Sequence, residues 1–137
     1  MVTTTPYAIT TTLDLDFDSA VRRVREELAS EGFGVLTEID VQATMKQKLG
    51  VDSEPYLILG ACNPPLAHRG LGIEPDLGVL LPCNVVVRTD GDTVRVSAME
   101  PNAAMHLAGN PDLAPLAEEA RTRLERALLR LDTRKTP

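Results

Sequence analysis

The sequence predicts an α+β fold in which helices pack on a mainly antiparallel five-stranded sheet. Three observations carry this prediction. Residues 5–13 and 33–40 alternate in polarity as strands do, and a helical pattern separates them. The dipeptide Asp90-Gly91 is a strong hairpin signal between two valine-rich runs. Apolar residues recur every three or four positions from Leu113 to Leu131, as in an amphipathic helix.

Length and composition are those of one globular domain. A chain of 137 residues can bury a core without disulfides, and its 43% apolar and 25% charged residues are ordinary proportions. Aromatic side chains are scarce, so the core must be mostly aliphatic. We therefore expect a single domain over residues 1–137, with its core at about 6–131.

The charge balance and the N-terminus argue against several partners. The net charge is −6, and the arginines of 22–25 and 121–135 are interleaved with acidic residues, so we expect no nucleic-acid binding. No apolar run is long enough to span a membrane. Residues 1–6 lack the features of a signal peptide, and two cysteines without such a peptide indicate reduced thiols. The sequence therefore predicts a cytoplasmic protein.

Two strand–helix pairs form the N-terminal half of the prediction. The first strand places Tyr7 on the same face as Ile9, and a helix over 17–31 follows, capped by acidic residues and ended by Gly32. The second strand, 33–40, leads into a helix over 41–49 that Asp40 caps. Met45 lies on the apolar stripe of that helix, so we expect it to fill the core.

The segment 56–62 is apolar on both faces, which is typical of a strand covered on both sides by helices or by a partner subunit. Because few helices are available to cover it, we expect a homodimer. Asn63 is the expected cap of a short helix from Pro64 to His68 or Leu71. The glycines that follow predict a loop over about 70–78.

The hairpin after Pro82 fixes two faces. A two-residue type I′ turn at Asp90-Gly91 predicts that Val87 faces Val94 and that Cys83 lies on the same apolar face. The opposite face then carries Asn84, Arg88, Thr93, Arg95 and Ser97.

Three segments and one proline resemble a known family. They are Phe33–Asp40, Leu57–Pro64, Leu80–Val85 and Pro101. In this combination the chain resembles the bacterial and archaeal family known as domain of unknown function 302, over roughly residues 6–131. The resemblance implies a small two-layer α+β sandwich, typically a homodimer, with no assigned activity. It carries over no catalytic residue.

Cys62 and Cys83 are the strongest chemical candidates because both lie at strand ends. In one interpretation they form a redox pair, or a soft-metal site completed by His68, Met105 or His106. In the other, each is a small buried residue. No C-x-x-C or tetrahedral ligand spacing is present, so we predict no metal site. We expect both thiols at the same end of the sheet, unbonded, with a raised pKa for Cys83.

Three functional hypotheses follow. The leading one is a non-catalytic homodimer that binds a small molecule or a protein near Cys62, Asn63 and His68. The second is a thiol- or metal-dependent redox protein that uses Cys62 and Cys83, and the third is a purely structural interaction domain. No catalytic group and no cofactor are predicted, because no Ser-His-Asp or Cys-His pairing can be placed from the spacing. The candidate ligand-binding residues are Cys62, Asn63, His68, Cys83, Asn84 and His106.

Overall fold

Six strands form one antiparallel sheet in the spatial order β1-β2-β6-β5-β4-β3. The structure is a computed structural model that describes residues 1–132. It confirms the predicted α+β class but has one strand more than the five expected. The extra strand β1 has only two residues, too few to show an alternating pattern. The strands are β1 (Thr3–Thr4), β2 (Ala8–Leu13), β3 (Gly34–Asp40), β4 (Tyr56–Cys62), β5 (Cys83–Asp90) and β6 (Thr93–Met99).

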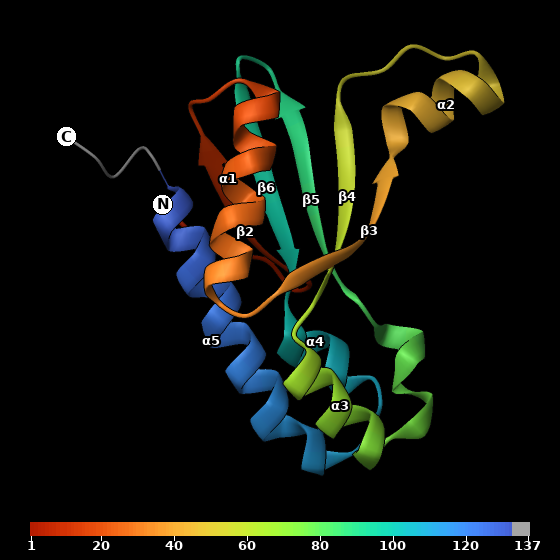
Figure 1. Cartoon of the computed structure of the whole chain (residues 1–137), viewed down its shortest axis with the longest axis vertical. Helices are drawn as coiled ribbons and strands as arrows, with labels where there is room; N and C mark the ends of the chain where they lie inside the picture. Colours follow the sequence, from red (N-terminus) through yellow and green to blue (C-terminus); the bar gives the residue numbers. More distant parts are fainter. Residues whose placement is uncertain (133–137) are drawn as a thin grey trace.

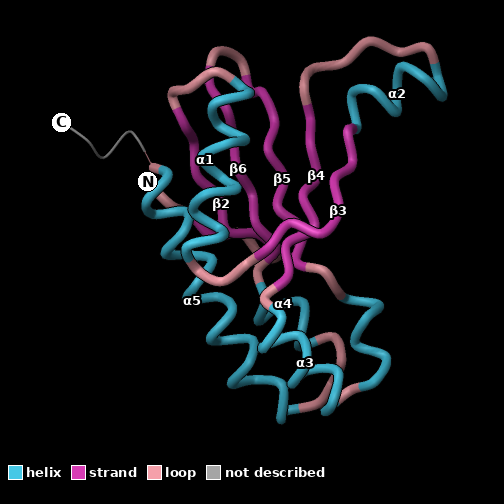
Figure 2. Tube along the Cα trace, in the orientation of Figure 1, coloured by secondary structure: helices cyan, strands magenta, loops and turns pink. Residues whose placement is uncertain are grey.

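Two long helices cover one face of this sheet. Helices α1 (Phe17–Ser30) and α5 (Ala114–Leu131) lie side by side against it, as Figure 1 shows. Their apolar stripes meet the inward-facing side chains of the central strands to form the main core. No helix lies across the opposite face in the described part of the chain, as can be followed in Figure 2. The fully buried residues include Ile9, Leu13, Val24, Leu28, Leu59, Val85, Val87, Val96, Leu124 and Leu128.

The shorter helices, except for the one over Val41–Leu49, gather at one end of the sheet (Figure 1). They are α3 (Pro64–Ile73), α4 (Pro101–His106) and the 3₁₀ helices η1 (Pro75–Leu80) and η2 (Pro111–Leu113). The loop predicted over 70–78 is wrong, because α3 continues to Ile73 and η1 begins at Pro75. Gly70 packs against Leu77 rather than breaking the helix, and a Cβ there would come within 2.8 Å of Leu77 Cδ2. None of the helices in residues 1–132 is long and apolar enough to cross a bilayer.

Helix α2 (Val41–Leu49) departs most from expectation. Asp40 caps it and Gly50 ends it as predicted, but none of its residues is buried. The prediction that Met45 fills the core is wrong, since this side chain is 37% exposed. The helix leaves the edge strand β3 and projects away from α1 (Figure 1), and its main contacts within residues 1–132 are with β3 and β4. We refer to residues 34–51 as the arm.

The hairpin has the predicted faces but a different register. Val87 pairs with Val96 rather than with Val94, because the two turn residues are Gly91 and Asp92. Gly91 has a φ of 64° and Asp92 has no positive φ, whereas a type I′ turn needs a positive φ at both central positions. The difference is two residues along the strand, so every side chain keeps its predicted face.

A buried carboxylate ties α1 to α5. The Glu31 side chain is 8% exposed, and its two oxygens each accept a hydrogen bond of 2.9 Å, one from Arg126 and one from Arg130. Burial raises the pKa of Glu31, but the arginine hydrogen bonds outweigh it and the pKa falls below its ordinary value. The carboxylate therefore stays charged and holds the two helices in register over the sheet.

We predict that Leu128→Ala destabilises the fold by about 2–5 kcal/mol, because the side chain is fully buried between α5 and the sheet. Leu129→Ala is the matched control: the neighbouring leucine is 38% exposed and should cost much less. Urea denaturation of both variants measures the difference. Equal losses of stability would contradict the assignment of the core face of α5.

Candidate functional site

The uncovered face of the sheet, called here the open face, is set by strand alternation. Val85 and Val87 of β5 point into the core, so Val86 between them points away from α1 and α5. Antiparallel pairing with β6 places Ser97 opposite Val86 on the same face. The open face also carries Thr10, Ile39, Tyr56, Ile58, Asn84, Arg88, Arg95 and Met99.

A groove of about 640 Å³ lies on the open face where the sheet meets the shorter helices. Its volume falls within the range of small-molecule sites, about 300–1,000 Å³. Its floor comes from β5 and β6, one wall from the end of η1 and the residues after it, and the other wall from α4. The lining side chains are mainly apolar and include Asn84, Val86, Ser97, Met99, Val79, Leu80, Leu81, Pro82, Ala103, Ala104 and Leu107.

Three large apolar side chains stand exposed at this groove. Val79 is 86% exposed, Leu107 76% and Tyr7 75%, and these are the three highest values among the large apolar residues described. Tyr7 was expected inside the first strand, but β2 begins one residue later and leaves the ring outside the sheet. Exposed apolar groups gathered in one place mark a binding surface more often than scattered ones do.

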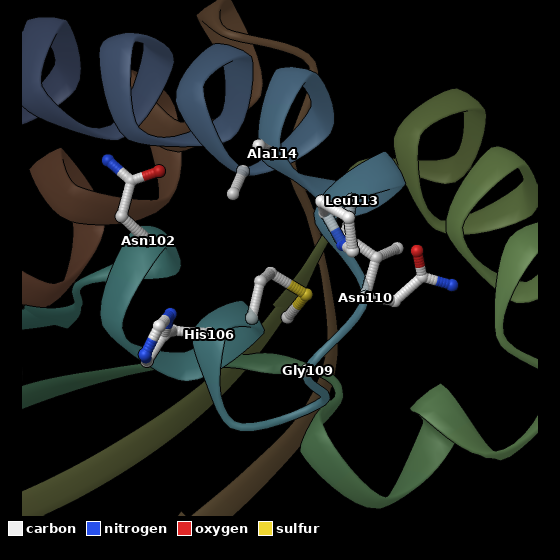
Figure 3. A pocket seen from close by; sticks show the side chains of 9 residues that line it. Asn102, His106, Gly109, Asn110, Leu113 and Ala114 are labelled. Atoms are coloured by element: carbon white, nitrogen blue, oxygen red, sulfur yellow. The ribbon is translucent and has the colours of Figure 1, made fainter.

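A second pocket, of about 380 Å³, lies on the other side of α4. His106 and Asn102 lie on one side of it and Asn110 on the other (Figure 3). The polar atoms of Asn110 are already engaged: the amide donates to Glu74 at 3.1 Å and the oxygen accepts from the Asp112 N–H at 3.0 Å. His106 is exposed and has no acidic or nucleophilic residue beside it in the pocket lining, so we assign it no catalytic role.

The two cysteines lie at the same end of the sheet, as expected, and both are free. In the antiparallel ladder Cys83 pairs with Ala61, the residue before Cys62. Cys83 is buried on the core face and Cys62, one position out of phase, points to the open face. Burial, with a smaller contribution from the nearby Cys62, raises the pKa of Cys83 to about 11. A thiol with this pKa is a poor nucleophile at neutral pH.

The other predicted site residues do not converge. Asn63 is buried and caps α3, its oxygen accepting from the Leu66 N–H at 3.3 Å while its amide donates to Glu31 O at 3.4 Å. His68 is exposed on α3, outside the paired strands β4 and β5 that carry the cysteines. Asn63 and Cys83 both line a small pocket of about 50 Å³. Of the six candidates, Asn84 alone lines the open-face groove.

The described residues hold no group of three or more His, Cys, Asp or Glu side chains placed to bind a metal ion. Completion of the cysteine pair by His68 or His106 would need such a group, whereas completion by Met105 stays a prediction.

The groove residues Tyr7, Val79 and Leu107 were missed by sequence reasoning. They come from three segments far apart in the chain, and each stands in an irregular or short element where no periodicity marks its exposure. One signal was available: the alternation of the hairpin places Asn84, Arg88 and Arg95 on one face, and that face is the open one.

Comparisons with known proteins agree with this fold. The sequence pattern of the family described as Domain of unknown function DUF302 matches residues 9–131. Among solved structures, the crystal structure of uncharacterized conserved protein DUF302 from Bacillus stearothermophilus is 31% identical to this chain. The two superpose with a TM-score of 0.85, over 90% of this chain and 97% of that one. None of the curated proteins matches.

We predict that one thiol of the native protein reacts quickly with a disulfide reagent and one slowly. A pKa of about 11 against an ordinary 9.0 leaves Cys83 with roughly a hundredfold less thiolate near neutral pH, and its burial blocks access. Cys62→Ser should remove the fast phase, and Cys83→Ser should leave it intact. Two fast thiols in the wild-type protein would instead favour the redox hypothesis.

Proposed function

The chain belongs to the family described as Domain of unknown function DUF302, and from that premise we propose a function based on the site itself. The protein is a non-catalytic homodimeric module that binds a small molecule in the open-face groove. This proposal keeps the type of function that the sequence favoured and moves the site from Cys62, Asn63 and His68 to the groove.

One observation carries the proposal. Val79, Leu107 and Tyr7 are the most exposed large apolar residues described, and all three line one groove of ligand-sized volume. Leaving these side chains in water forfeits the free energy of their burial, about 25 cal/mol per Å² of apolar surface. A ligand seated in the groove recovers part of it, and Asn84 and Ser97 on the floor supply polar contacts that fix its orientation.

The groove lining argues for binding rather than catalysis. Its titratable residues are Tyr7 and Glu100, and the Glu100 carboxylate is already engaged. One oxygen accepts from the Ala103 N–H at 2.7 Å, and the other lies 2.9 Å from Arg121 Nε. With this carboxylate occupied, the lining offers no activated nucleophile and no free general base.

The arm supports a dimer. Its strand β3 is an edge strand, and Leu36, Ile39 and Leu49 are 68%, 50% and 69% exposed. An edge strand with exposed apolar side chains is a ready surface for a second copy, and a symmetric contact would bury the same residues twice. The arm and the groove lining have no residue in common, so a contact between two arms would not directly bury the groove residues.

A crossed pair of variants tests both halves of the proposal. Leu49→Glu places a charge on the arm, and Val79→Glu places one on the groove rim; both sites are exposed, so neither should unfold the protein. Light scattering reports the mass against 14.8 kDa per chain, and fluorescence of the neutral dye Nile red reports groove occupancy.

We expect the wild type to be a dimer that binds the dye. Leu49→Glu should give monomers that still bind it, and Val79→Glu should give dimers whose dye affinity falls about ten-fold or more. A monomeric wild type would contradict the dimer. A dimer that never binds the dye would contradict the ligand site and leave a purely structural interaction domain.

A further inference from the structure

Two arginines stand at the end of the groove floor. Arg88 of β5 and Arg95 of β6 are paired directly opposite each other on the open face. Each lies two residues along its strand from a floor residue, Arg88 from Val86 and Arg95 from Ser97. Two residues of a strand span roughly 7 Å, so the backbone of this arginine pair lies about that far beyond the groove floor. In the free protein Arg88 reaches toward Asp90 and Arg95 toward Thr10, and both guanidinium groups must turn toward each other to hold one carboxylate.

Neither arginine is fully neutralised by the protein. Arg88 Nη1 lies 3.8 Å from Asp90 Oδ1, a long contact between partly exposed groups and therefore a weak one. Arg95 donates to the Thr10 hydroxyl at 3.3 Å, and the described residues give it no carboxylate partner. Both side chains are half-buried.

This arrangement costs stability in the free protein. Although the net charge of the chain is −6, two positive side chains stand directly opposite each other here. Like charges in this position on two antiparallel strands repel each other. An anion placed between the two side chains removes the repulsion. The planar guanidinium fork matches a carboxylate better than any other cationic side chain does.

We propose that the ligand of the groove is an anionic amphiphile. Its carboxylate lies between Arg88 and Arg95, and its apolar tail runs over Val86 into the groove, toward Val79 and Leu107. This inference rests on the proposed function, because it names the class of molecule that the groove takes. The combination of paired positive charge and adjoining apolar groove is what selects such a molecule over a neutral apolar one.

A carboxylate of a second copy is the competing occupant for the arginines. In that case Arg88 and Arg95 would belong to the dimer contact, and their loss would weaken dimerisation. The arm carries the exposed apolar residues of the proposed dimer, and the arginines lie on other strands. The test therefore measures the oligomeric state together with ligand affinity.

Calorimetric titration with three eight-carbon probes at pH 7 tests the inference. Octanoate is anionic, octan-1-ol is neutral and octylamine is cationic, and the tails are matched. We expect octanoate to bind about ten-fold or more tightly than octan-1-ol, and octylamine to bind most weakly. Added salt should reduce the difference in affinity between octanoate and octan-1-ol, because part of the attraction between octanoate and the arginines acts between exposed charges.

Variants that remove one positive charge show which residues bind the carboxylate of octanoate. Arg95→Gln and Arg88→Gln should each lower octanoate affinity about ten-fold and leave octan-1-ol affinity and the dimer mass unchanged. Arg95→Lys keeps the charge but loses the fork, so it should lie between wild type and Arg95→Gln. Thermal melts confirm that each variant is folded. If Arg95→Gln unfolds because it loses the contact with Thr10, Arg88→Gln still tests the inference.

The outcomes separate the two proposals. Equal affinity for octanoate and octan-1-ol would overturn the anionic ligand class and leave the proposed function standing. No binding of either probe would overturn the proposed function and this inference with it. Dimers that dissociate when Arg88 or Arg95 is replaced would assign the arginines to the second copy and overturn the inference.

Discussion

The packing of α1 and α5 against one face of the sheet is the constraint on which the rest of the structure depends. The two helices hold the fully buried side chains Leu28, Leu124 and Leu128 against the inward-facing valines of the central strands. The buried Glu31 carboxylate, bonded to Arg126 and Arg130, fixes the helices to each other. With both long helices on one face, no long helix of residues 1–132 is left for the other, and that face must be stable in contact with water, a ligand or a partner.

The sequence of the open face fits this description. An antiparallel sheet with one solvated face normally alternates apolar and polar residues, as β5 and β6 do with Val85 and Val87 inward and Arg88 and Arg95 outward. The alternation is incomplete, because Val86 and Ile58 are apolar and point outward. The end of η1 and helix α4 form two walls beside this part of the sheet, so the face is a groove there. The exposure of the groove and of the arginine pair on this face is therefore a consequence of one-sided coverage.

Sequence patterns predicted the features that depend on residues close together in the chain. The stripe of α5, an acidic cap before α1, the Asp40 cap of α2 and the inward face of the hairpin depend on neighbours a few positions away, and all were predicted. Met45 was misjudged because a helical stripe shows which face is apolar but not whether anything packs on it. The groove was missed for the same reason, since Tyr7, Val79 and Leu107 meet only through the tertiary fold. Asn84, Arg88 and Arg95 were placed on one face, yet only the structure shows that this face is uncovered.

Methyl NMR shows whether the open face is the binding surface. Val86 and its strand neighbours Val85 and Val87 differ only in which face they point to, so they are internal controls for each other. On titration with octanoate, we expect the methyl signals of Val86, Val79 and Leu107 to shift together and saturably, while those of Val85 and Val87 stay nearly fixed. Shifts confined to the core valines, or to Leu36 and Leu49 of the arm, would contradict it.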